Sequence, residues 1–210
     1  SHDLFLMEAM WTRFIPATEK LLELIGSGTI GKPFILHADF GIRAPFDPTG
    51  RLFNKELGGS SLMDLGIYPI YLSLLLFGKP DTIRAMARMT KTGVDGYCSI
   101  LFGYEQEKNA VLESTIKTDT PVEAVVHGEH GSIRLHRSWH HSKKITVVKD
   151  GKVTSSYDLP YEGNGYIFEI DEVNRCLQND LRESPKMPHH MSLDLIETID
   201  RVKEQIGLSY

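Results

Sequence analysis

The feature that most constrains the fold of this chain is a series of seven short runs between Thr82 and Asp158, separated by turn-forming residues. Runs of this length, bounded by Gly, Asn and Asp, are typical of strands joined by hairpins. The clearest hairpin is expected at Lys149–Lys152, where Asp-Gly favours a tight turn. The predicted strands are 83–89, 97–104, 110–117, 122–127, 132–136, 144–148 and 153–157. Together they predict a mainly antiparallel sheet.

Further elements are predicted on both sides of this region. Before it we expect a helix at Ala17–Ile25, a strand at Phe34–Ile42 and a helix that carries Asp64 and Tyr68 and stops at Gly78; after it, helices at Tyr166–Asn179 and Ser192–Gly207, with Ser192 as a cap. The short apolar run Leu4–Met7 is interpreted as a buried strand. The predicted fold class is α+β, with an open, mainly antiparallel sheet and helices packed on one face.

Composition narrows the function classes. The chain has 210 residues and a formal charge of −5, which gives no electrostatic reason to expect nucleic acid or an anionic membrane as a partner. The longest apolar run, Leu72–Phe77, is far too short to span a bilayer. Only Cys98 and Cys176 are present, so no disulfide framework is implied. We expect a cytoplasmic protein with a small-molecule partner.

The segment Gly58–Tyr68 contains the pattern that most resembles chemistry. Asp64 and Tyr68 are four residues apart, which places them on one face of a regular helix. A tyrosine can exchange a proton with an alcohol or carbonyl when a nearby cation lowers its pKa. Two structural alternatives remain: Asp64 could cap the helix together with Ser61, and Tyr68 could be a core residue. Pro69 predicts a kink directly after Tyr68, or a regular helix that begins only there.

Three segments together resemble one known family over nearly the whole chain. They are Leu6–Phe14, Gly58–Tyr68 and Glu183–Pro185, and they are similar to the C-terminal half of the glucose-fructose oxidoreductase and inositol dehydrogenase (Gfo/Idh/MocA) family. The family's helix motif usually has histidine where Tyr68 stands. Tyrosine at this position is similar to the dihydrodiol dehydrogenase branch.

The resemblance implies a domain organisation and a cofactor. Family members join an N-terminal Rossmann domain, which binds NAD or NADP, to a C-terminal α+β domain. This chain has no Gly-x-Gly-x-x-Gly that follows a strand and no Glu-Lys-Pro, so we expect the Rossmann domain to be absent. Residues 1–15 would be a remnant of the junction, and residues 16–210 the substrate and oligomerisation domain. The chain alone should then be inactive, with no cofactor-binding residue of its own.

The resemblance also implies roles for individual residues. Tyr68 would exchange the proton at the reacting hydroxyl, and Asp64 would help to position the site. Substrate-binding roles are implied for five residues: Trp11, Arg13, Phe40, Trp139 and Tyr161. As alternatives, Trp11 and Phe40 could be core aromatics, and Arg13 could pair with an acid at a domain boundary.

The expected partners are a diol or sugar substrate and further copies of the chain. By the resemblance, the open sheet face would form a homodimer or a higher oligomer. Although nine histidines are present, their spacing lacks acidic or thiolate ligands in a rigid motif, so no metal site is predicted. Two other functions remain open: a non-catalytic oligomerisation or binding module in which Tyr68 is structural, and an oxidoreductase that acts on sugars.

Overall fold

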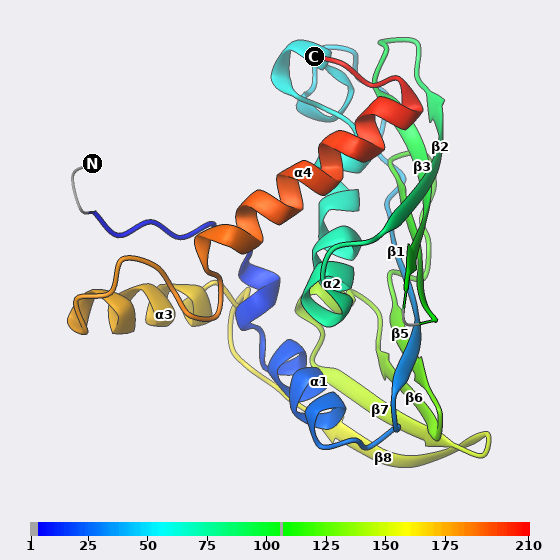
Figure 1. Cartoon of the computed structure of the whole chain (residues 1–210). Coiled ribbons are helices and arrows are strands. Elements are labelled where there is room, and N and C mark those ends of the chain that lie inside the picture. The colour runs from blue at the N-terminus through cyan, green and yellow to red at the C-terminus, as the bar shows by residue number, and fades with distance from the viewer. Residues whose placement is uncertain (1–3, 106) are drawn as a thin grey trace.

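The computed structural model describes residues 4–105 and 107–210, which form one eight-stranded sheet with helices beside it (Figure 1). The strand order is β2-β3-β4-β1-β5-β6-β7-β8. The strands are β1 Pro33–Gly41, β2 Thr82–Met89, β3 Asp95–Tyr104, β4 Lys108–Thr115, β5 Ala124–Gly128, β6 Gly131–Leu135, β7 Lys144–Lys149 and β8 Lys152–Asp158. All seven strands predicted between Thr82 and Asp158 are confirmed, as is the hairpin between β7 and β8.

Strand β1 occupies the middle of the sheet. It pairs parallel with β4, with Ala38 opposite Leu112, and antiparallel with β5, with Ala38 opposite Ala124. Every other neighbouring pair is antiparallel. The sheet is therefore mainly antiparallel, and the α+β class is confirmed. The first strand in sequence, β1, lies between two antiparallel meanders, β2 to β4 and β5 to β8.

Three of the four α-helices lie along one face of the sheet (Figure 1). The helices are α1 Pro16–Gly26, α2 Ile67–Phe77, α3 Ile167–Gln178 and α4 His189–Ile206, and the short turns include η1 Trp11–Phe14, η2 Arg51–Phe53, η4 Leu62–Gly66 and η5 Trp139–His141. The core lies between the sheet and α2, where Ile70 and Leu72 are completely buried, as are Leu36, Phe102 and Leu112 on the strands. Burying each such side chain stabilises the fold by about 1.5–3 kcal/mol.

Helix α3 departs from the predicted arrangement. It lies apart from the sheet in Figure 1 and packs mainly against η1. Three apolar side chains at helical spacing form an apolar stripe on α3, and this stripe is largely uncovered: Ile167 and Ile170 are each 50% exposed and Leu177 is 53% exposed. The prediction that all the helices pack on one sheet face is wrong for α3, because its apolar side faces away from this sheet.

Two predictions near the chain ends are also wrong. Residues 4–7 form no strand: Leu4 is 75% exposed, and Leu6 donates its N–H to the carbonyl of Arg182 at 3.1 Å in an irregular segment. Helix α4 begins at His189, after the extended residue Pro188, so Ser192 lies inside the helix and caps nothing. Residues 1–3 of the predicted junction segment lie outside the described residues.

One helical stretch in the described part of the chain, Lys55–Phe77, is long and apolar enough to cross a membrane by length and composition alone. It is 61% buried inside the protein, and it is divided between short turns and α2. Burial against the sheet explains its apolar character, as expected for the core helix of a globular domain.

The loop before this helix comes very close to its start at Gly59. A Cβ atom on Gly59 would lie 2.0 Å from the carbonyl oxygen of Arg51 and 2.8 Å from that of Leu52. Only glycine permits this approach of one backbone to another. This close backbone packing at Gly59 holds η2, which carries Arg51, against the segment that leads to Asp64.

We therefore expect Gly59→Ala to destabilise the protein by about 2–3 kcal/mol, because a backbone clash forces the loop to move. The measurement is urea unfolding followed by circular dichroism. Gly26→Ala is the matched control, since its Cβ would have no atom within 4 Å, and it should be neutral or slightly stabilising. Equal stability of the two variants would contradict this account of Gly59.

Candidate functional site

The helix start that carries Asp64 is closed by a capping box centred on Ser60. The Ser60 Oγ accepts the N–H of Met63 at 2.8 Å, and Asp64 Oδ2 accepts the N–H of Ser60 at 3.4 Å. Asp64 is also paired with Arg51 from η2. Its side chain is only 6% exposed. The geometry therefore matches the capping alternative for Asp64, with Ser60 in place of Ser61 as the cap.

Ser61 instead ties the helix start to the sheet. Its Oγ donates to Asp95 Oδ2 at 2.5 Å, and the N–H of Leu62 donates to the same oxygen at 3.0 Å. Asp95 is the first residue of β3 and is completely buried, which raises the pKa of its carboxyl group. Two hydrogen bonds to one buried carboxylate oxygen place the first turn of the helix with little freedom.

Asp64 lies inside a π-type turn, η4 Leu62–Gly66, and Tyr68 follows in α2, which begins at Ile67. The segment that joins them is therefore not the regular helix that was predicted. The charge of Asp64 is nevertheless close enough to raise the pKa of Tyr68. Pro69 lies in the first turn of α2, where a missing N–H is tolerated. The irregular turn thus precedes Tyr68, and the regular helix begins at Ile67, two residues before the start that the second alternative placed at Pro69.

Tyr68 is half-buried and its hydroxyl is held by Trp11. The Trp11 Nε1–H donates to the Tyr68 hydroxyl oxygen at 3.1 Å. Burial raises the pKa of Tyr68, and the nearby Tyr166, Glu169 and Asp64 raise it further, while the hydrogen bond from Trp11 lowers it. Because burial and the neighbouring acids act in the same direction, the phenol stays protonated in this chain at neutral pH.

Aromatic rings from four other parts of the chain gather around Tyr68: η1, β1, η5 and the residue before α3. The ring centroid of Tyr68 lies 5.5 Å from that of Phe40 and 5.4 Å from that of His140, and Phe40 stacks on His140 at 4.2 Å. Trp11 stacks on His141 at 5.4 Å and meets Tyr166 edge-on at 4.8 Å. We call these six residues the aromatic cluster: Trp11, Phe40, Tyr68, His140, His141 and Tyr166.

The predicted substrate-binding residues divide into two groups. Trp11 and Phe40 are in the aromatic cluster. Trp139 is fully buried behind it, where its Nε1–H donates to the carbonyl of Asp39 at 2.9 Å. Tyr161 lies beside the cluster and donates its hydroxyl to the carbonyl of His141 at 2.6 Å.

Arg13 does not join the aromatic cluster. Its guanidinium pairs with Glu19 at 3.0 Å and donates to the carbonyl of Lys186, also at 3.0 Å. Only 10% of the Arg13 side chain is exposed. These contacts match the alternative in which Arg13 pairs with an acid, and they connect η1 to α1 and to the loop before α4.

The sequence analysis missed His140, His141, Tyr166 and Glu169 as members of this site. The two histidines were considered only as metal ligands and set aside, since the spacing of the histidines lacks acidic or thiolate ligands in a rigid motif. Among residues 4–105 and 107–210, no group of three or more His, Cys, Asp or Glu side chains is placed to hold a metal ion. Tyr166 and Glu169 lie around the start of α3 and contribute through packing that no local pattern shows.

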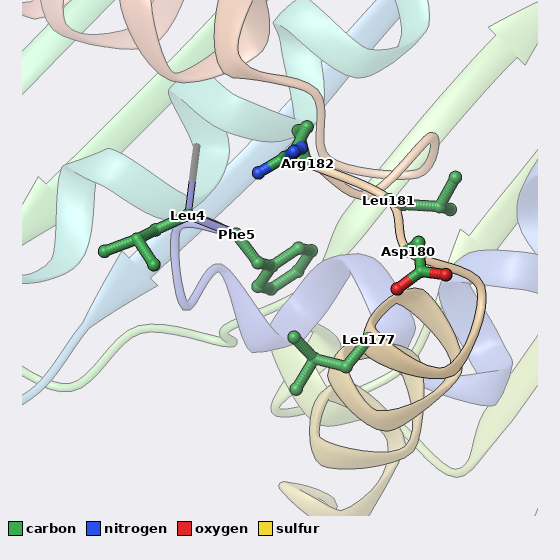
Figure 2. Close-up of a pocket in the computed structure, with 6 residues that line it drawn as sticks. All are labelled: Leu4, Phe5, Leu177, Asp180, Leu181 and Arg182. Carbon is green, nitrogen blue, oxygen red and sulfur yellow. The ribbon is translucent and has the colours of Figure 1, made fainter. Parts of the chain in front are cut away.

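A separate pocket lies between the N-terminal segment and the end of α3 (Figure 2). In Figure 2, Phe5 and Leu177 face each other across it. Its lining residues are Leu4, Phe5, Leu177, Asp180, Leu181 and Arg182. None of them belongs to the aromatic cluster, so this pocket is distinct from the surroundings of Tyr68.

Burial, together with the neighbouring His141, lowers the pKa of His140 to about 3. In the unfolded chain the pKa of histidine is about 6.5, so the unfolded state gains a proton between pH 7 and pH 5 and the folded state does not. The wild-type protein should therefore lose about 2 kcal/mol more stability than His140→Phe over this range. Urea unfolding at pH 7 and pH 5 measures this difference. His130→Phe, at an exposed turn, should keep the wild-type pH dependence; equal slopes for wild type and His140→Phe would contradict the burial of a neutral imidazole.

Comparison with known proteins identifies the family. Residues 18–134 match the family model described as the GFO/IDH/MocA C-terminal domain. The chain is 32% identical to a trans-1,2-dihydrobenzene-1,2-diol dehydrogenase of Xenopus laevis, and the match covers 99% of this chain and 64% of that protein. It is also 30% identical to a D-xylose 1-dehydrogenase (NADP(+)) of Hypocrea jecorina, over 99% of this chain and 61% of that protein. The chain therefore belongs to the Gfo/Idh/MocA family of oxidoreductases, and it spans less than two thirds of the length of these relatives.

Solved structures show the same fold. Aldose-aldose oxidoreductase from Caulobacter crescentus, complexed with glycerol, superposes with a TM-score of 0.80 at 21% identity, over 96% of this chain and 62% of that one. An oxidoreductase from Agrobacterium radiobacter, in complex with NAD+, L-tartaric acid and magnesium, superposes with a TM-score of 0.75 at 16% identity, over 98% and 64%. At such low identity, these likenesses establish the fold alone.

Proposed function

We propose that this chain is the C-terminal substrate-binding and oligomerisation domain of an NAD(P)-dependent oxidoreductase that acts on a CH–OH group of a cyclic diol or a sugar, with Tyr68 as the proton-transfer residue. The observation that carries the proposal is the Tyr68 hydroxyl, held at 3.1 Å by Trp11 among aromatic rings. The names of the relatives, which act on a dihydrodiol and on D-xylose, support this substrate class.

The geometry suits Tyr68 to proton transfer. Because Trp11 donates to the phenol oxygen, the proton of Tyr68 remains available for another acceptor, such as a substrate oxygen. Oxidation of an alcohol to a ketone removes the hydroxyl proton and a hydride from carbon, and the phenolate form of Tyr68 would take the proton. In the reverse direction, the phenol would return it to the carbonyl oxygen.

The phenolate needs a positive charge that the aromatic cluster does not contain. The titratable neighbours that raise the pKa of Tyr68 are a second phenol, Tyr166, and the carboxylates of Glu169 and Asp64, and none of them supplies a positive charge. The cation must then come from outside the cluster, and the family resemblance places a lysine in the N-terminal domain. When bound beside this site, the nicotinamide would accept the hydride.

The glycine segment of this chain does not fit a dinucleotide. Gly26–Gly31 follows helix α1 and leads into β1, whereas a pyrophosphate-binding turn follows a strand and opens a helix. Gly28 and Gly31 have φ values of +69° and +70°, which suits a helix end and a turn. We assign the binding of the cofactor to a domain that precedes residue 1. To Asp64 we assign a positioning role, because it caps the helix that carries Tyr68.

Two uncovered surfaces support this domain organisation. Beside the N-terminal segment, Leu6 is 66% exposed and Leu193 on α4 is 60% exposed, together with the apolar stripe of α3. A preceding domain would cover them, in line with the missing third of the relatives' length. On the open sheet face, Met86 is 60% exposed and Leu101 is 47% exposed, which favours association of copies through that face.

In the full-length enzyme, Tyr68→Phe should lower kcat for diol oxidation by about 10²–10⁴-fold, because the proton acceptor is lost while the ring remains. Initial rates of NADP reduction measure the effect. Tyr157→Phe, on β8 and outside the aromatic cluster, is the control and should keep wild-type rates. Wild-type kcat in Tyr68→Phe would support the alternative that the chain is a binding module with a structural Tyr68.

The 210-residue chain by itself should neither bind NAD(P) appreciably nor oxidise a diol. It lacks both a phosphate-binding turn and the Glu-Lys-Pro motif, whose lysine would supply the positive charge beside Tyr68. Isothermal titration with NADP and NAD, followed by a turnover assay with the same sample, tests this. Restoration of activity when the N-terminal domain is supplied would support the division of labour. Cofactor reduction by the chain alone would refute it.

A further inference from the structure

Two polar atoms beside Tyr68 have no hydrogen-bond partner. His140 Nδ1 and Glu169 Oε2 are both shielded from solvent and unpaired. A buried polar atom without a partner costs about 1–3 kcal/mol, and native proteins keep few of them. Since both occur around the same tyrosine, a common cause is a ligand that supplies the missing partners.

His140 occupies a position that an aromatic hydrocarbon ring would fill at lower cost. It is 9% exposed, stacks on Phe40 at 4.2 Å and meets Trp11 edge-on at 5.8 Å. Phenylalanine would keep these contacts without an unpaired nitrogen. With its pKa lowered to about 3, the imidazole is neutral at physiological pH and presents one N–H donor and one nitrogen acceptor.

Glu169 approaches the cluster from α3. It lies in the first turn of that helix, which packs against η1, and Tyr166 just before it contacts Trp11 at 4.8 Å. Its charge is close enough to raise the pKa of Tyr68. The residue as a whole is only half-buried, but its Oε2 atom is shielded from solvent and accepts no hydrogen bond.

We infer that His140 and Glu169 form a second hydroxyl-binding position beside Tyr68, which binds a hydroxyl group of the substrate that does not react. This inference rests on the proposed function. A hydroxyl group has one proton to donate and two lone pairs that accept: it can donate to the Glu169 carboxylate and accept from an N–H at His140 Nδ1. A site built to bind such a group discriminates strongly against analogues that lack it, because its polar atoms then stay unpaired.

The test compares trans-cyclohexane-1,2-diol with cyclohexanol as substrates of the full-length enzyme. In His140→Phe and in Glu169→Gln, the ratio of kcat/KM for the diol to that for cyclohexanol should fall about tenfold or more. His130→Phe and Glu162→Gln, both at exposed positions outside the cluster, are matched controls and should keep the wild-type ratio. His140→Phe should also keep or raise the Tm, since it removes an unpaired polar atom.

An unchanged ratio in both His140→Phe and Glu169→Gln would overturn the inference, as would equal losses for the two substrates with a lowered Tm.

Binding is measured separately as the rise in Tm on adding the diol, which should shrink in both variants. If the wild-type enzyme oxidises neither alcohol, the proposed function fails. A diol-dependent rise in Tm that both variants lose would still support the hydroxyl-binding position, and its absence in the wild type would overturn it.

Discussion

The attachment of one helix start to the sheet, through the buried carboxylate of Asp95, is the interaction on which the site depends. Asp95 begins β3 and accepts hydrogen bonds from Ser61 and Leu62 at the point where the chain turns into the helix. Gly66, four residues further along, packs so closely on β4 that an added Cβ would lie 3.0 Å from Ser114 Oγ. The direction of the helix, and with it the position of Tyr68, follows from these contacts.

Among the residues that the structure describes, the site lacks the positive charge that would stabilise the phenolate form of Tyr68. Burial, the carboxylates of Glu169 and Asp64 and the phenol of Tyr166 favour the protonated form of Tyr68, and only the Trp11 hydrogen bond opposes them. A chain built to use a phenolate by itself would supply a cation, as proton-transfer tyrosines require. The arrangement is therefore that of a substrate half, in which the aromatic cluster holds the tyrosine and a second domain controls its charge.

The fold could be predicted from sequence wherever a local pattern decides the structure. The strands between Thr82 and Asp158 and the helix near Ala17–Ile25 follow from turn residues and apolar periodicity, so they were found. The insertion of β1 between β4 and β5 is set by long-range pairing, and the uncovered side of α3 by the lack of a packing partner in this chain. Neither leaves a local signal.

The site shows the same division. Tyr68 and Trp11 could be selected because they lie in segments that resemble the family, and Phe40 because the resemblance implies a substrate-binding role for it. His140 could not be predicted as a site residue, because its role depends on a contact that no local pattern shows. Its ring stacks on Phe40, about 100 residues earlier in the chain. The capping role of Asp64 was foreseen as an alternative, although the partner proved to be Ser60, one residue earlier than expected.

The central position of β1 has a consequence for how the chain reaches this structure. Strands β2 to β4 and β5 to β8 are each joined by short connections and can form locally, whereas β1 leaves the ribosome first and must wait for partners at residues 109–115 and 124–128. Until they arrive, its apolar side chains stay uncovered. Closing β1 between the two halves therefore costs more chain entropy than forming either meander. It also joins Phe40, on β1, to the ring of His140, so that the aromatic cluster is completed only when the sheet is.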